Sequence, residues 1–128
     1  MKKLLALGLV IFTSLLLTGC GQTKPEDVAK NFYQALEDKN VDKAYGMLYL
    51  DTKASQHEME TKGKLQMIVG EVSSRIEQKG GTQSIEVGDV VTKEDNARVQ
   101  LHITFNNKTQ SDETFNLRKQ NDEWKIRL

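Results

Sequence analysis

The stretch ARVQLHITF at residues 97–105 decides the fold class, because apolar and polar residues alternate through it without a break. Its apolar members are Ala97, Val99, Leu101, Ile103 and Phe105, and its polar members are Arg98, Gln100, His102 and Thr104. Successive side chains of a strand point to opposite faces of the sheet. The pattern therefore predicts a half-buried strand that packs one face on a core and turns the other to solvent.

Similar patterns lie on both sides of this strand, separated by turn residues. Upstream, Ile85 and Val87 alternate, and Gly88-Asp89 predicts an irregularity before Val90 and Val91. Downstream, a third strand runs through Phe115 and Leu117, and a last strand contains Trp124, Ile126 and Leu128. Turns are predicted at Lys93–Asn96, Asn106–Lys108 and Lys119–Asp122. The second half of the chain is thus expected to form a four-stranded antiparallel meander.

Upstream of Thr82 the apolar period is about 3.6, which predicts three helices. The first starts at a capping box, Thr23 to Glu26, with Pro25 in its first turn, and runs to about Asp38. Asn40 caps a second helix that carries Val41, Ala44, Tyr45, Leu48 and Tyr49 and is broken at Asp51-Thr52-Lys53. The third follows a capping box from Ser55 to Glu58, carries Leu65, Ile68, Val69, Val72 and Ile76, and ends at Gly80-Gly81. Gly63 and Gly70 within it predict a bend or a close crossing.

Helices followed by an antiparallel sheet define an α+β domain, with three N-terminal helices packed on one face of the meander. A curved sheet folded over helices leaves a cone-shaped space between the two layers. Residues 25–128 are expected to form this single domain.

The order of elements resembles the nuclear transport factor 2-like, or cystatin-like, superfamily, and in particular the small lipoproteins grouped as domain of unknown function 4878. The resemblance covers roughly residues 24–128 and rests on three runs: Pro25–Leu36, Asp42–Tyr45 and Glu123–Ile126. It implies a cone-like fold. That fold hosts enzymes, binding modules and assembly domains alike, so it implies no single function.

The N-terminus has the pattern of an export signal. Lys2 and Lys3 precede an apolar stretch, Leu4–Leu17, that is too short for the roughly 20 residues a spanning helix needs. It ends in Leu17-Thr18-Gly19-Cys20, which resembles the lipobox of bacterial lipoproteins. The resemblance implies cleavage between Gly19 and Cys20 and attachment of acyl chains, such as palmitate, at Cys20. Residues 1–19 are then the signal peptide, and residues 20–24 the lipidated cysteine and a short spacer.

An exported lipoprotein is expected to be held at a membrane by the lipid on Cys20. Gly21 is not the Asp that retains lipoproteins at the inner membrane, so resemblance favours the outer membrane, facing the periplasm, in a host with two membranes. In a host with one membrane the domain lies on the cell surface. A plain N-terminal anchor with an incidental cysteine is the alternative interpretation.

Charge and cysteine content exclude several function classes. The chain carries 18 basic and 18 acidic residues, and loss of Lys2 and Lys3 leaves a net charge of −2. A domain of this charge has no basic footprint for nucleic acid. Cys20 is the single cysteine, so no disulfide forms within the chain. No metal site or cofactor is indicated by the spacing of His, Cys and acidic residues.

Acid–base candidates are few. They are Tyr33, Tyr45, Tyr49, Asp51 and His102, and a pocket in the cone is expected to involve Tyr33, Tyr45, Tyr49 and Trp124. For Tyr45 and Tyr49, which lie one helical turn apart, we favour the alternative that they are core aromatic residues with solvated hydroxyls. The acidic pairs Glu94-Asp95 and Asp112-Glu113 are interpreted as solvated turn residues, His57 as part of a helix start, and Met47, Met59 and Met67 as packing residues.

No catalytic residue can be named from these patterns. The expected function is a non-catalytic binding or assembly domain presented at the membrane to a protein, peptide or small apolar ligand. A small enzyme that uses a polar group in the cone is one alternative, and a structural envelope protein is the other. An enzyme requires a pocket with a carboxylate or His beside a Tyr of perturbed pKa. The sequence does not indicate an oligomeric state.

Overall fold

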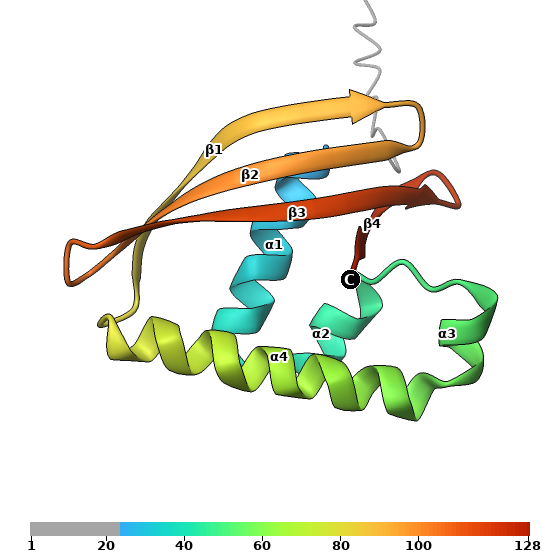
Figure 1. The fold of residues 1–128 in the computed structure, drawn as a ribbon, viewed down its shortest axis with the longest axis horizontal. Helices are drawn as coiled ribbons and strands as arrows, with labels where there is room; N and C mark the ends of the chain where they lie inside the picture. Colours follow the sequence, from blue (N-terminus) through green and yellow to red (C-terminus); the bar gives the residue numbers. More distant parts are fainter. Residues whose placement is uncertain (1–23) are drawn as a thin grey trace, which may run out of the picture.

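A computed structural model describes residues 24–128, which form a helical layer followed by one antiparallel sheet (Figure 1). The helices are α1 (Pro25–Glu37), α2 (Val41–Gly46), α3 (Thr52–Gln56) and α4 (Glu58–Gln78). The strands are β1 (Thr82–Lys93), β2 (Asn96–Phe105), β3 (Gln110–Gln120) and β4 (Glu123–Arg127), in the spatial order β1-β2-β3-β4. The expected α+β meander is therefore confirmed, with a short fourth helix, α3, added among the described residues.

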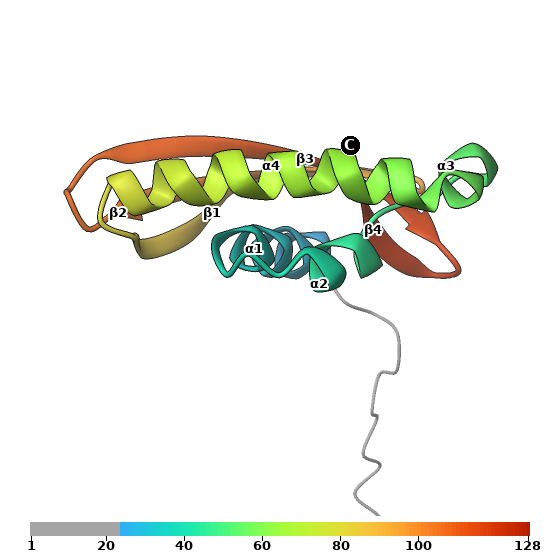
Figure 2. The same cartoon turned by 90° about the horizontal axis from the view of Figure 1, so that it is seen from below.

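The two layers cross each other. Figure 1 shows α1 running across the strands, while α4 runs lengthwise, roughly along the strand direction. Seen from below in Figure 2, α1 is viewed nearly end-on, and α4 runs along the length of the sheet. The long helix α4 packs on α1 and α2. None of the helices in residues 24–128 is long and apolar enough to cross a membrane.

The core lies between α1 and the inner face of the sheet. Val99, Leu101 and Ile103 of β2 are completely buried, as the alternation predicts. They meet a stripe on α1 that contains Val28, Ala29, Phe32, Ala35 and Leu36. The ring of Phe32 packs edge-on against Phe115 of β3, with 5.9 Å between centroids. The predicted irregularity at Gly88-Asp89 is also confirmed, because the pairing of β1 with β2 shifts register between Val87 and Val90.

The second helix is shorter than its apolar spacing predicts. It ends at Gly46, and the following residues pair with β4 instead. Leu48 forms a parallel bridge with Ile126, and the Tyr49 amide donates to the Ile126 carbonyl at 2.7 Å. Pairing with β4 thus satisfies backbone groups of these residues that would otherwise be bonded within a further turn of α2.

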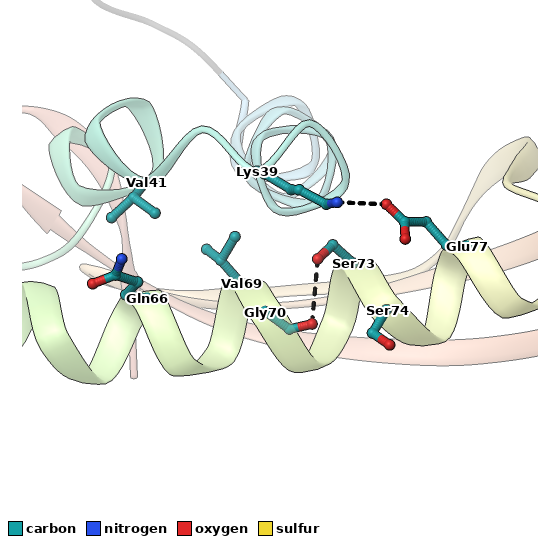
Figure 3. Close-up of a pocket in the computed structure, with 8 residues that line it drawn as sticks. All are labelled: Lys39, Val41, Gln66, Val69, Gly70, Ser73, Ser74 and Glu77. Carbon is teal, nitrogen blue, oxygen red and sulfur yellow. Dashed lines mark hydrogen bonds and ion pairs between the residues drawn. The ribbon is translucent and has the colours of Figure 1, made fainter.

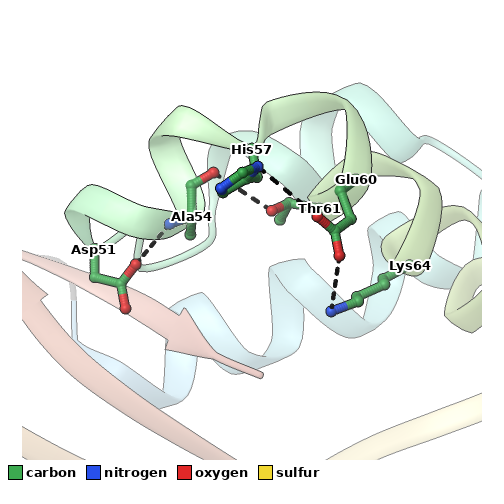
Figure 4. Close-up of polar contacts among 6 residues, drawn as sticks. All are labelled: Asp51, Ala54, His57, Glu60, Thr61 and Lys64. Carbon is green, nitrogen blue, oxygen red and sulfur yellow. Dashed lines mark hydrogen bonds and ion pairs between the residues drawn. The ribbon is translucent and has the colours of Figure 1, made fainter.

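Two predicted capping boxes are wrong. The N-cap of α1 is Lys24, whose side chain makes no capping bond; Thr23 lies outside the described residues. Ser55 sits inside α3 and does not cap α4; Asp51, predicted to break a helix, instead caps α3 by accepting from the Ala54 amide at 2.7 Å (Figure 4). A carboxylate satisfies exposed amides at a helix start, which explains the extra short helix.

Glycines in and after α4 differ in their roles. The helix is continuous through Gly63 and Gly70, and a Cβ at either would meet nothing within 4 Å, so neither marks a close crossing. Gly80 and Gly81, by contrast, have φ of +83° and +92° and end the helix as predicted. Two methionines expected to pack are exposed, since Met59 and Met67 keep 88% and 76% of their surface.

Candidate functional site

A pocket of about 230 Å³ lies between the helical layer and the sheet. β4 pairs only with Asn116–Gln120, so the remaining part of β3 has no partner on that edge. The pocket opens beside this unpaired edge. Its walls come from α1, α4, β3 and the end of β4, and are mainly apolar. The lining residues are Phe32, Tyr33, Leu36, Ile68, Val72, Glu113, Thr114, Phe115, Asn116, Ile126, Arg127 and Leu128.

Glu113 is the one carboxylate side chain in this lining. It is paired across the ladder with Leu101, which is completely buried, and residues directly opposite in a ladder share a face. The half-buried Glu113 side chain accepts a hydrogen bond from the Ser111 hydroxyl at 3.3 Å. The interpretation of Asp112-Glu113 as solvated turn residues is therefore wrong for Glu113; Asp112 also lies in β3 and not in a turn, but its side chain is solvated as expected. The parity that Glu113 shares with Phe115 and Leu117 in the sequence is the signal that would have found it.

Tyr33 lies beside this carboxylate and is the member of the predicted aromatic set that lines the pocket. It is 2% exposed, and its hydroxyl hydrogen-bonds the Thr82 hydroxyl at 2.9 Å. The Thr82 amide in turn donates to Glu37 at 3.2 Å. Burial raises the pKa of Tyr33 above 10.0, the negative charges of Glu37 and Glu113 raise it further, and the hydrogen bond from Thr82 opposes them. The phenol is thus held neutral, as a hydrogen-bonding group.

The other predicted pocket residues lie elsewhere. Tyr45 is half-buried on α2, with the Lys62 ammonium 4.9 Å from its ring centroid. Tyr49 follows α2 and lines a separate small hollow that also includes Asp51, with the Arg118 guanidinium 5.3 Å from its ring. Trp124 is 8% exposed in β4 and packs in the core. The structure therefore does not bring these three aromatic side chains together with Tyr33 in one site.

His102 lies on the outer face of the sheet, as its parity predicts. Its Nδ1 is 2.5 Å from Asp112 Oδ1, the residue opposite it on β3. This hydrogen bond raises the pKa of His102 above 6.5, and nearby Glu86 and Asp89 act in the same direction. Gly88 makes room for the ring, because a Cβ there would meet His102 Nε2 at 2.5 Å. Both side chains are exposed to solvent, so we interpret them as a surface ion pair.

The second histidine belongs to a helix start. His57 is the N-cap of α4, and its Nδ1 is 3.9 Å from Glu60, whose other oxygen faces Lys64 at 3.8 Å (Figure 4). Within residues 24–128 no group of three or more His, Cys, Asp or Glu side chains is arranged to hold a metal ion.

A second hollow lies on the opposite side of α4, between that helix and the α1–α2 connection (Figure 3). Its volume is about 350 Å³, larger than the inner pocket. However, Lys39 and Glu77 pair with each other across it at 2.6 Å, and the Ser73 hydroxyl donates to the Gly70 carbonyl at 3.3 Å. Its two charged side chains are thus paired with each other. The inner pocket, in contrast, contains a carboxylate and Arg127, neither of which forms an ion pair among the described residues.

The sequence pattern of the domain of unknown function DUF4878 matches residues 18–127 of the chain. The chain belongs to the DUF4878 family. The match spans every described helix and strand, and it also includes Gly19 and Cys20, the predicted cleavage and lipidation residues, which lie outside the described residues. Among curated proteins no sequence matches this DUF4878 chain.

Two solved structures are similar to this DUF4878 domain. A Campylobacter jejuni protein named as a candidate NTF2-like transpeptidase superposes with a TM-score of 0.76 at 23% identity, over 83% of this chain and 99% of that one. A de novo designed NTF2 fold protein, NT-9, superposes with a TM-score of 0.48 at 13% identity, over 83% and 85% of the two chains. The superposition on the Campylobacter jejuni structure confirms the nuclear transport factor 2-like fold expected from the element order.

Proposed function

We propose that this DUF4878 protein is a lipoprotein whose small, non-catalytic domain binds a ligand in the inner pocket. The observation that carries the binding part is the pocket itself, an apolar space open to solvent between helices and sheet. Ligand sites are typically concave, mostly apolar and supplied with a few polar groups that orient the ligand. Glu113, Tyr33 and Arg127 are those polar groups here.

The anchoring part rests on the N-terminal pattern. The apolar run Leu4–Leu17 followed by Leu17-Thr18-Gly19-Cys20 resembles the lipobox, and the family match begins at residue 18 and so includes the cysteine. Two or three acyl chains, at about 0.8 kcal/mol per buried methylene, are enough to hold a protein at a membrane. The compartment that we propose is the outer membrane facing the periplasm, or the cell surface of a host with one membrane.

Mass spectrometry tests the anchor. The chain purified from bacterial membranes should begin at Cys20 and carry acyl chains, whereas Cys20→Ala should keep its signal segment and lose firm membrane partitioning. Gln22→Ala, two residues away, is the control and should be processed like wild type. An unmodified Cys20 on a chain that still begins at Met1 would contradict the proposal.

Ligand-detected NMR with a set of small apolar fragments tests the pocket. Fragments should bind the wild-type chain and lose binding in Val72→Trp, which fills the pocket from α4. Met67→Trp adds the same ring to the same helix at an exposed position, and should bind as wild type does. Binding that survives Val72→Trp, or no binding to wild type, would refute the pocket as the site.

A second candidate function is catalysis in the same pocket, because a carboxylate and a phenol of raised pKa share it. Glu113 would remove a proton next to a carbonyl, and Tyr33 would donate to the enolate oxygen. Exchange of the α-protons of cyclohexanone in D₂O tests this, since exchange should depend on Glu113. We favour binding because the described hydrogen bonds join Tyr33 to Thr82 and Glu113 to Ser111, and not to each other.

The name of the Campylobacter jejuni protein does not extend to this chain. A transpeptidase transfers an acyl group, commonly through a Ser or Cys nucleophile. None of the residues that line the inner pocket is a serine or a cysteine, and the single cysteine of the chain is the one in the lipobox. We therefore do not propose acyl transfer.

A further inference from the structure

We propose that the inner pocket selects a protonated amine carried on a compact apolar body. This inference rests on the proposed binding function and specifies the chemical class of its ligand. It follows from three features of the pocket: its aromatic walls, its carboxylate and the sign of the charges around it.

The walls favour a cation with an apolar body. Phe32, Tyr33 and Phe115 contribute three aromatic rings, and Leu36, Ile68, Val72 and Ile126 supply aliphatic surface. The faces of aromatic rings attract ammonium groups, by about 0.5–2 kcal/mol depending on desolvation. The volume of about 230 Å³ lies just below the range of roughly 300–1,000 Å³ usual for small-molecule sites. The occupant is accordingly compact, on the scale of one ring or a short alkyl chain.

The carboxylate supplies the partner for the amine. Glu113 is half-buried, and its described contact is the hydroxyl of Ser111, a neutral donor. Its carboxylate forms no ion pair within residues 24–128, although Arg127 lines the same pocket. A charged donor of the ligand can therefore take the position that no side chain of the described domain occupies, and a charge-assisted hydrogen bond is the strongest kind available there.

The local field has the matching sign. Glu37 and Glu113 both act on the Tyr33 hydroxyl. The phenol stays neutral and engaged with Thr82. A carboxylate ligand would have to approach Glu113 against this field, with the exposed Arg127 as the single cationic side chain in the lining. A protonated amine is instead attracted, because its positive charge is complementary to the negative charges of Glu37 and Glu113.

Three probes that share one ring and one chain length test the inference by isothermal titration calorimetry: 2-phenylethylamine, 2-phenylethanol and 3-phenylpropanoate. Each is titrated at pH 7 into the full chain in non-ionic detergent, and titration into micelles alone gives the blank. The amine should bind at least about tenfold more tightly than the alcohol, the ratio expected for a hydrogen bond to a charged group. The propanoate should bind most weakly.

Two variants localise the effect. Glu113→Gln keeps the shape of the side chain and should reduce the affinity for the amine to that for the alcohol. Asp112→Asn makes the same charge change on the adjacent residue, which faces the outer side of the sheet and contacts His102. This control should leave the preference for the amine intact.

Each remaining outcome overturns a different statement. Equal binding of amine and alcohol refutes selection for an amine but leaves an apolar binding pocket, and stronger binding of the propanoate assigns the site to anions through Arg127. Equal loss in Glu113→Gln and Asp112→Asn attributes the preference to overall charge and refutes this site. No binding of any probe to the wild-type chain refutes the proposed pocket function as well.

Discussion

At the scale of single residues, the inner pocket depends on two side chains whose positions are fixed by different means. Tyr33 is held by a hydrogen bond from α1 to the start of β1, at Thr82. Glu113 is held by strand register, since its place opposite Leu101 turns it toward the core. Glu113 is half-buried although the Leu opposite it is fully buried, so its carboxylate is accessible to the ligand that we propose.

Tyr33→Phe tests the environment of the phenol. The pKa of Tyr33 is raised above 10.0 in the folded chain, so the unfolded chain loses this proton at lower pH. The free energy of unfolding therefore falls as pH rises above about 10, while the contribution is fully present below that pH. Urea unfolding at pH 8, 9.5 and 10.5 should show a shallower fall for Tyr33→Phe than for wild type. At pH 8 the variant should lose about 0.5–1.5 kcal/mol with its hydrogen bond. Parallel pH curves for the two proteins would contradict the buried phenol.

At the scale of elements, strands were more predictable than helix ends. The alternation in β2 identified the sheet and its inner face correctly, because a period of two does not depend on the conformation of the turns. The end of α2 was not predictable from spacing, because Leu48 has the periodicity of a helix but pairs with Ile126, far away in sequence. The sequence likewise predicts Asp51 as a helix breaker, whereas in the structure Asp51 is the N-cap of α3.

The same distinction applies to the candidate site. Tyr33 could be named from the sequence because the chain has three tyrosines and all three were candidates. Glu113 was assigned to a turn because it follows Asn106–Lys108 closely, although β3 already begins at Gln110. The sequence does not show that Tyr45, Tyr49 and Trp124 lie in different places, because all three are simply aromatic residues near apolar positions. In the structure each contacts a different cation, namely Lys62, Arg118 and Lys119.

Two glycine substitutions separate helix propensity from helix termination in α4. Gly70→Ala should stabilise the domain by about 0.5–1 kcal/mol, because a Cβ at Gly70 meets nothing within 4 Å and Ala is the better helix former. Gly80→Ala should destabilise it by about 1–2 kcal/mol, because φ is +83° there. Thermal unfolding followed by circular dichroism measures both. A loss of stability in Gly70→Ala would mean that other atoms occupy the space beside Gly70 in the second hollow.

At the scale of the whole molecule, β4 joins the helical layer to the sheet. One edge of β4 pairs with β3 and the other with the segment after α2, where the Ile126 amide donates to the Met47 carbonyl at 2.8 Å. The Lys125 ammonium also donates to the Gly46 carbonyl at 3.0 Å. Because β4 is short, it leaves the neighbouring half of β3 uncovered, and this is where the pocket opens. The strand that closes the fold therefore also defines the mouth of the site.

Trp124→Ala tests how much the side chains of β4 contribute to the core. Trp124 is 8% exposed on β4, so truncation removes the largest side chain of the last core strand and should cost about 3–5 kcal/mol. That is a large share of the roughly 5–15 kcal/mol by which a domain is normally stable. Met59→Ala is the control, because Met59 is 88% exposed and its truncation should change stability by less than about 0.5 kcal/mol. Urea unfolding of both variants measures the difference. If Trp124→Ala costs no more than Met59→Ala, the indole does not contribute to the core.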